Sequence, residues 1–159
     1  MGFIYDATTF KKLGEFTFPS REGWGMTTNG TNLIMSDGTS NITYLDPNTF
    51  QVVKTLNVND NNGPVSNVNE FELIRGYLYA NQWQTDYILK IDTSTVKVVG
   101  RLDLGPIAVE ARNKFAGSET LNGMAYNPAS GLVYVTGKLG PVSTSSNCRS
   151  DRHRTATVS

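Results

Sequence analysis

The chain has 159 residues, of which 38% are hydrophobic and 18% charged, and its formal net charge is zero. This composition is typical of a folded globular domain. It has neither the basic excess that is typical of a nucleic-acid-binding protein nor the acidic excess of a disordered acidic chain. No apolar run has the length of a membrane-spanning helix. The opening residues, MGFIYDATTF, lack the basic start and the apolar core of a signal peptide, so we expect none.

The first predicted element in chain order is a pair of strands joined by an aspartate turn, and this unit returns twice. Apolar and polar residues alternate on both sides of Asp6, Asp46 and Asp92, as in half-buried strands. Aspartate side chains can accept hydrogen bonds from the backbone of a turn, which favours a hairpin connection at each site. The three matching segments are FIYDATTFKKLGEFTF (3–18), TYLDPNTFQVVKTLNV (43–58) and LKIDTSTVKVVGRLDL (89–104).

Shorter strands are predicted between these units, so that the repeat holds about four strands. The strand-like segments are EGWGMTTNG (22–30), TNLIMSDGTSNITYLD (31–46), NVNEFELIRG (67–76), GYLYANQWQTDYILKID (76–92), LNGMAYNPASG (122–131) and GLVYVTGKLG (131–140). The turn aspartates lie 40 and then 46 residues apart, a spacing typical of β-propeller blades. A β-sandwich would not be expected to repeat this unit in register. Residues 105–120 are interpreted as an insertion between blades that holds a helical turn.

The sequence therefore predicts an all-β fold, a partial β-propeller over residues 1–141. The chain begins with the last two strands of one blade, continues through two complete blades and ends within another. Closed propellers use roughly four or more blades, so we expect a fragment or a chain that oligomerises. Residues 142–159 are rich in Ser, Thr and Arg and poor in apolar residues, and we interpret them as a disordered tail.

Few residues are available for cysteine, histidine or metal chemistry. Cys148 is the only cysteine and His153 the only histidine, so an internal disulfide, a thiolate metal cluster and a histidine-based active site are not expected. The segment DNNGP (60–64) has too few carboxylates for a calcium loop and is interpreted as a turn. No metal site is predicted.

Five motifs occur in order over residues 2–138. They are GFIYDATTF, EGWGMTTNGTNLIMSDGTSNITYLDPNTF, NVNEFELIRGYLYANQWQTDYILKID, LNGMAYNP and VYVTGK. Together they closely resemble the plant and bacterial type of glutaminyl-peptide cyclotransferase. The resemblance implies a five-bladed propeller, of which this chain would supply about three blades. It also implies conversion of an N-terminal glutamine to pyroglutamate with release of ammonia. The partner would be a peptide or protein with N-terminal glutamine, and no cofactor or nucleic acid is implied.

The same resemblance assigns roles to four residues at one mouth of the central channel. It implies that Trp24 of EGWG lines the pocket and that Asn69 of NVNEFEL hydrogen-bonds the substrate amide. Trp83 of NQWQTD would form an aromatic wall against the glutamine side chain. Lys138 of VTGK would supply positive charge near the pocket.

Departures from the family pattern leave the function of this chain open. The family's acid/base glutamate, in an F-x-E-G-L-type stretch of an earlier blade, has no counterpart here. The carboxylates in the matched site motifs are Glu22 and Glu70, which are weak candidates for the missing base. A non-catalytic propeller fragment that binds peptides is therefore the alternative, and a calcium-dependent lactonase-like propeller is a weaker one. Localisation is also open, since the sequons at Asn29 and Asn41 would matter only in a secreted protein.

Overall fold

The computed structural model describes residues 1–139 and, for the backbone alone, 144–147. Short strands dominate it, with a single helix in this part of the chain. In order the elements are β1 (Gly2–Tyr5), β2 (Lys12–Phe16), β3 (Met26–Thr28), β4 (Leu33–Ser36), β5 (Asn41–Leu45), β6 (Val52–Asn57), β7 (Asn59–Asp60), β8 (Gly63–Pro64), β9 (Val68–Ile74), β10 (Tyr77–Gln82), β11 (Tyr87–Asp92), β12 (Val98–Asp103), α1 (Gly105–Lys114), β13 (Leu121–Asn127), β14 (Leu132–Gly137) and β15 (Thr144–Asn147).

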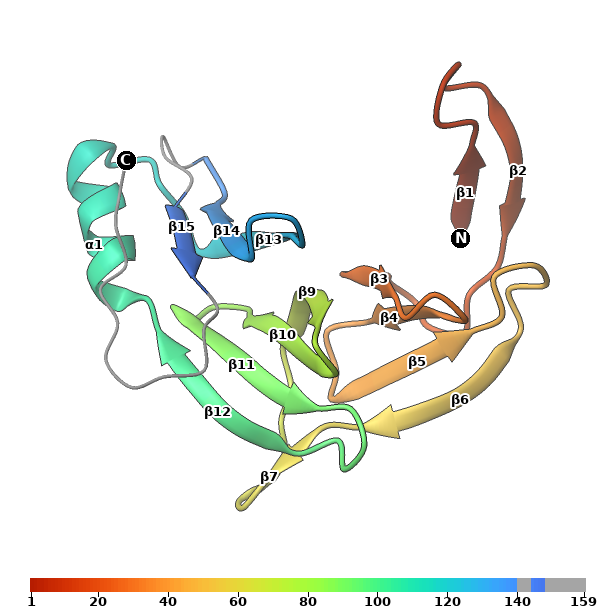
Figure 1. Ribbon diagram of the computed structural model, residues 1–159, viewed down its shortest axis with the longest axis horizontal. Coiled ribbons are helices and arrows are strands. Elements are labelled where there is room, and N and C mark those ends of the chain that lie inside the picture. The colour runs from red at the N-terminus through yellow and green to blue at the C-terminus, as the bar shows by residue number, and fades with distance from the viewer. Residues whose placement is uncertain (140–143, 148–159) are drawn as a thin grey trace.

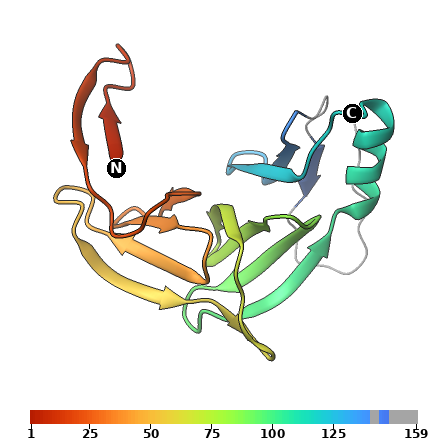
Figure 2. The same cartoon turned by 180° about the vertical axis from the view of Figure 1, so that it is seen from behind.

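The sheets are antiparallel meanders that follow one another around an arc (Figure 1). Two of them have four strands, β3–β6 and β9–β12, while β1–β2 and β13–β15 make a two-stranded and a three-stranded sheet at the ends. Strands β3, β9 and β13 face the concave side, and β6 and β12 form the convex side (Figures 1 and 2). This arrangement confirms the predicted partial β-propeller, in which each sheet is a blade and the first strand of each complete blade is innermost.

Each predicted aspartate turn forms the hydrogen bonds that its sequence allows. The Oδ1 atom of Asp46 accepts backbone N–H groups from Asn48 and Thr49, and the equivalent atoms of Asp6 and Asp92 bond in the same way. The residue four positions after each aspartate has a positive φ, as at Phe50 (58°). Phe50 then stacks on Phe16 of the preceding blade at 4.0 Å between ring centroids. The Asp46 turn therefore contacts the preceding blade through Phe50.

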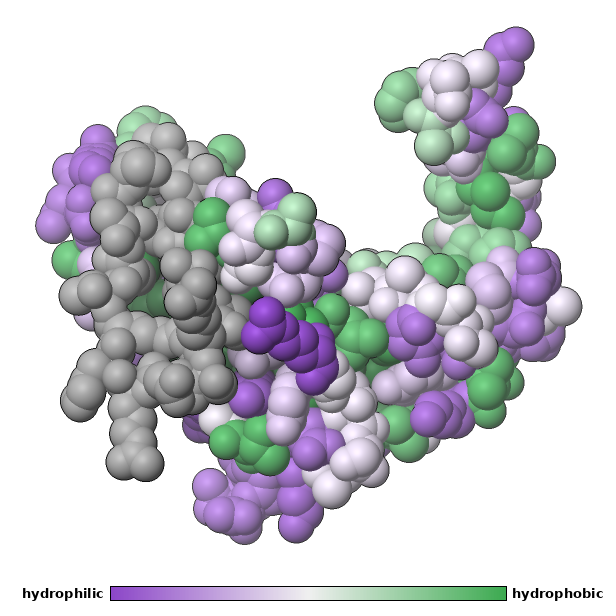
Figure 3. Space-filling model, viewed as in Figure 1, coloured by the Kyte–Doolittle hydropathy of each residue, from purple (hydrophilic) through white to green (hydrophobic). Residues whose placement is uncertain are grey.

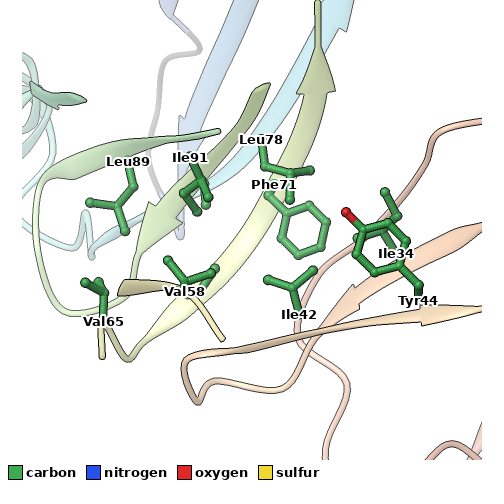
Figure 4. Packing of buried hydrophobic residues seen from close by; sticks show 11 residues of the cluster. Ile34, Ile42, Tyr44, Val58, Val65, Phe71, Leu78, Leu89 and Ile91 are labelled. Carbon is green, nitrogen blue, oxygen red and sulfur yellow. The ribbon is translucent and has the colours of Figure 1, made fainter. Parts of the chain in front are cut away.

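Two buried apolar clusters hold successive blades together. The first joins the two complete blades, with Ile34 and Ile42 packing toward Phe71 and Leu78 (Figure 4). The second joins the blade of β9–β12 to that of β13–β15 and includes Ala108 of α1. Alternate residues of the strands reach these clusters, which accounts for the period-two pattern of the sequence.

The hairpin of β1 and β2 projects from the rest of the molecule (Figures 1 and 3). It leaves several apolar side chains exposed, among them Phe3, Tyr5, Phe10 and Leu13. In the complete blades, strands of this kind pack against inner strands. The exposed hairpin therefore corresponds to the outer two strands of a blade, and within the described residues no inner strand pairs with it.

The structure refines three expectations. The insertion contains a ten-residue helix, longer than the predicted turn, which starts with Pro106 in its first turn and ends with Arg112 and Lys114. The DNNGP segment turns as predicted, between the two-residue strands β7 and β8. Within the segment interpreted as a tail, the backbone of residues 144–147 forms β15, which pairs with β14. The rest of the tail, with Cys148 and His153, lies outside the described residues, so its assignment stays a prediction.

Candidate functional site

Each of the three described innermost strands carries the same irregularity at its start. In the blade of β9, Phe71 pairs with Ala80 and Val68 with Gln82, so that Asn69 and Glu70 together oppose Asn81. This two-against-one arrangement is a β-bulge, a feature that re-aims side chains and is common beside functional sites.

The neighbouring blades repeat this bulge. On β13, Asn122 and Gly123 oppose Thr136, because the pairing shifts between Leu121 and Met124. Ahead of β3, the backbone of Ser36 bonds to both Trp24 and Gly25. Trp24, Asn69 and Asn122 are therefore equivalent residues of three blades, each at the first bulge position.

A second set of equivalent positions lies directly after the second strand of each blade. Met35, Ala80 and Val135 are equivalent residues of the three second strands. The residues three positions after them are Gly38, Trp83 and Lys138. Because the first two strands are antiparallel, the start of one adjoins the end of the other. All six positions thus lie at one end of the sheets, and they include the four residues that the sequence assigns to a site.

Trp24 and Trp83 contact each other across the boundary between the two complete blades. Their rings meet edge to face, with 5.2 Å between the centroids and an interplanar angle of 78°. The Trp24 ring lies over Gly38, where an added Cβ would come within 2.5 Å of it. Gly38 also has a φ of 80°, which favours glycine. The glycine therefore leaves the space that Trp24 needs to reach Trp83.

Hydrogen bonds fix this tryptophan pair from both sides. The Nε1–H of Trp24 donates to Oε2 of Glu22 at 2.7 Å, which orients the indole. The backbone N–H of Asn67 donates to the Gly38 carbonyl, and the Trp83 N–H donates to the Asn67 carbonyl. Both rings are held by backbone that bridges two blades, so the pair is preorganised.

Buried polar side chains connect each complete blade to the next innermost strand. Ser36 Oγ accepts the Gly25 N–H at 2.9 Å and donates to the Asn69 carbonyl at 2.8 Å. At the equivalent position Asn81, only 1% exposed, accepts the Gly123 N–H through Oδ1. These bonds fix the relative position of the bulges. Within the described residues Asn81 Nδ2 is buried without a hydrogen-bond partner, which costs about 1–3 kcal/mol.

Asn69 and Glu70 face different surroundings although they share one bulge. Asn69 is buried, with 6% of its surface exposed, and its side chain has no hydrogen bond within the described residues. Glu70 is half-buried, and its Oε2 accepts the Met124 N–H at 2.9 Å. Burial raises the pKa of Glu70 to about 7 against the opposing effect of that hydrogen bond, and Glu72 adds a smaller increase. A cavity of about 310 Å³ adjoins Glu70 and residues 123–125 and 134–136.

Lys138 lies at the same end of the sheets but is not joined to the tryptophans. It is exposed, and no ion pair involves it among residues 1–139. Its backbone is held on both sides, since its N–H donates to the Thr120 carbonyl and its carbonyl accepts the Glu119 N–H. The structure thus places Trp24 and Trp83 in contact, Asn69 beside them on the next strand, and Lys138 one blade away.

Helix α1 supports the loop that carries Trp83. Arg112 pairs with Asp86 at 3.0 Å, and the Leu104 N–H donates to the Asp86 carbonyl at 2.9 Å. Asp86 ends the short loop that begins at Trp83. The insertion between blades is therefore attached to the same end of the propeller as the candidate site.

Some residues of this region were not found from the sequence. Gly38 and Ser36 are not identified by the sequence, although the internal repeat aligns GWGM, VNEF and LNGM and so offers a signal for the bulges. Among the described residues, no group of three or more histidine, cysteine, aspartate or glutamate side chains gathers as a metal site. No helix in that part of the chain is long and apolar enough to cross a membrane.

These features define the chain as part of a β-propeller with a tryptophan pair at one end of its sheets. Its residues 1–144 match the family model described as glutamine cyclotransferase. It is 34% identical over 141 residues to the glutaminyl-peptide cyclotransferase of Arabidopsis thaliana, which corresponds to 88% of this chain and 44% of the plant protein. The chain belongs to the glutamine cyclotransferase family, as its motifs predicted.

Solved structures agree with this assignment. The glutaminyl cyclase of Myxococcus xanthus matches with a TM-score of 0.69 and 36% identity, over 82% of this chain and 56% of the bacterial one. The hydrazine synthase of Kuenenia stuttgartiensis matches with a TM-score of 0.54 at 14% identity, over 91% of this chain and 36% of that one, and shows the fold alone. The chain thus spans about half the length of the family members it matches.

Proposed function

We propose that this chain binds peptides with an N-terminal glutamine through Trp24, Trp83 and Asn69. The observation that carries the proposal is the edge-to-face tryptophan pair at the channel mouth, beside a buried asparagine without a hydrogen-bond partner among the described residues. A glutamine side chain has two methylene groups, each of which gains about 0.8 kcal/mol on burial against apolar surface. Its carboxamide needs a donor and an acceptor, and the Asn69 carboxamide offers both.

The reaction proposed at this site is cyclisation of the bound glutamine. The α-amine attacks the side-chain carbonyl carbon, a C–N bond closes the five-membered ring, and the original amide C–N bond breaks to release ammonia. The amine loses one proton, and the leaving NH₂ group gains one. A single carboxyl group that first accepts and then donates a proton therefore balances the reaction.

Glu70 is the better of the two carboxylates proposed for this proton transfer. Its pKa of about 7 lies close to that of a peptide α-amine, which is near 8, so proton exchange between them needs little driving force. Glu22 is exposed and already accepts the Trp24 indole N–H. We assign it the orientation of Trp24 instead. Lys138 is proposed to add positive charge at the rim.

A non-catalytic peptide-binding fragment is the second candidate. The chain spans 44% of its plant relative, and the glutamate motif expected from the family pattern is not among its residues. The two candidates share the binding site and differ in whether Glu70 can replace that group.

The chain contains only two tryptophans, and both belong to the site, so intrinsic fluorescence reports directly on it. Titration of the purified chain with a glutamine-led peptide should change the fluorescence, whereas the same peptide led by glutamate should bind more weakly. Equal affinity for both peptides would contradict the proposal. Ammonia release from the glutamine-led peptide then separates the candidates, because binding without turnover supports the non-catalytic one.

A further inference from the structure

Four of the six equivalent positions at the channel mouth hold residues that the sequence assigns to the site. The other two are Gly38 and Asn122. Gly38 has no side chain, and the Trp24 ring already fills the space beside it. Asn122 is therefore the one remaining side chain of this set, and no role described above includes it.

The position of Asn122 is fixed by the preceding blade. The two backbone N–H groups that follow it, of Gly123 and Met124, donate to Asn81 Oδ1 and Glu70 Oε2. Asn122 itself is half-buried, and its side chain makes no hydrogen bond within residues 1–139. A held backbone with an unoccupied carboxamide is the arrangement expected of a residue that binds a ligand.

In the blade of β13 and β14, Asn122 and Lys138 occupy the positions that Asn69 and Trp83 occupy in the preceding blade. Because Lys138 takes the place of Trp83, its positive charge determines which group of a substrate can bind on this side. A positive charge disfavours the α-ammonium group of a substrate and favours a carbonyl oxygen. Glu70, one blade before, offers the negative charge that suits the amine.

We propose that Asn122, through its Nδ2–H and together with Lys138, binds the carbonyl oxygen of the substrate's first peptide bond. This inference rests on the proposed function, because it places the glutamine side chain at the tryptophan pair. The substrate is then held at three points. Its side chain lies between Trp24 and Trp83, its amine faces Glu70, and its first carbonyl faces Asn122.

The test compares two ligands and two variants by tryptophan fluorescence. One ligand is a glutamine-led peptide, and the other is the same peptide with its first carbonyl reduced to a methylene group. Asn122→Ala should bind the ordinary peptide about fivefold to tenfold more weakly than the unsubstituted chain, as for loss of one hydrogen bond. The reduced peptide should bind both proteins equally. Asn113→Ala, at an exposed asparagine of α1, is the control and should bind like the unsubstituted chain.

A purely structural role for Asn122 would weaken both ligands alike, and that result would overturn the inference, as would unchanged binding of the ordinary peptide. The melting temperatures of both variants identify a loss of fold. If the unsubstituted chain fails to prefer glutamine over glutamate, the proposed function itself is wrong. The two failures are therefore distinguishable in one experiment.

Discussion

Trp24 and Trp83 belong to different blades, yet their rings meet edge to face at 5.2 Å. Such aromatic pairs gain about 0.5–1.5 kcal/mol beyond the burial of their surfaces. The contact therefore links the proposed binding surface to the packing of one blade on the next. Changes at this boundary should affect ligand affinity and stability together.

Substitution of Trp83 by Ala should remove one wall of the site. We expect the affinity for a glutamine-led peptide to fall at least tenfold, since truncation of a tryptophan at a binding surface often costs about 2 kcal/mol. Isothermal titration calorimetry should measure this affinity, because the variant has lost one of the two tryptophans on which a fluorescence titration depends. Tyr87→Ala, at an exposed aromatic directly after the loop that ends at Asp86, is the control. Affinity unchanged in Trp83→Ala would remove Trp83 from the site.

Gly38→Ala should displace the Trp24 ring. The added Cβ would lie within 2.5 Å of that ring, and the φ of 80° disfavours any other residue. We expect a loss of stability of about 2 kcal/mol and a loss of peptide binding.

The control for this variant is Gly30→Ala. Gly30 has a similar φ of 85° but no neighbouring atom within 4 Å of an added Cβ. It should cost about 1 kcal/mol in stability and leave binding unchanged. Equal effects of the two variants on binding would show that the space over Gly38 does not position Trp24.

Ser36→Ala should weaken the connection between the two complete blades. It removes the acceptor of the buried Gly25 N–H and the donor to the Asn69 carbonyl. Chemical denaturation should show a free energy of unfolding lower by about 1–3 kcal/mol. Ser66→Ala, at an exposed position, should change it by less than about 0.5 kcal/mol. A neutral Ser36→Ala would mean that the remaining contacts between the blades, such as the apolar cluster and the Asn67 N–H bond to the Gly38 carbonyl, position them without Ser36.

Glu70 should make stability fall as the pH rises. Its pKa in the folded chain, about 7, lies above the ordinary value of 4.5. The folded chain therefore binds a proton that the unfolded chain has released between these values, and the free energy of unfolding decreases with pH across this range. Glu70→Gln keeps an acceptor for the Met124 N–H and should flatten the decrease. Above pH 7 it should be more stable by about 1 kcal/mol, after allowance for solvent screening. Parallel pH profiles of the two proteins would contradict this.

Arg112→Ala should loosen the Trp83 loop with little effect on global stability. The pair with Asp86 is partly exposed, with 39% and 26% of the two side chains accessible, so its contribution should stay below about 1 kcal/mol. Acrylamide should nevertheless quench the tryptophan fluorescence more strongly in this variant. Lys114→Ala removes the same charge from the same helix but breaks only the pair with Glu110. Its quenching should match that of the unsubstituted chain, and identical quenching in Arg112→Ala would exclude α1 as a support.

The blade repeat and its aspartate turns could be predicted because they depend on local chemistry. Alternation marks the strands, and Asp46 finds its hydrogen-bond donors within three residues. The bulges could not be predicted in the same way, because a register shift depends on which residue of a neighbouring strand lies opposite. The repeat of GWGM, VNEF and LNGM indicates that the three positions are equivalent, whereas the shift itself appears only in the pairing of the strands.

The site was predicted in part, and the missing part depends on contacts between blades. The motifs identified Trp24 and Trp83, but only the fold shows that they touch and that Gly38 leaves room for this. The raised pKa of Glu70 follows from burial between two innermost strands, which no single motif encodes. Helix α1 was underestimated because its sequence lacks a side-chain cap at the N-terminus and a marked apolar face.

The repeated bulge gives the three described blades equivalent positions at one end of the sheets. Each blade contributes one residue at its bulge and one after its second strand, on a backbone arrangement that repeats from blade to blade. A substitution at one of these positions alters the chemistry of one sector, except where side chains of two blades touch, as Trp24 and Trp83 do. Ligand preference in such a propeller can therefore diverge one sector at a time, while the apolar contacts that hold the blades together are retained.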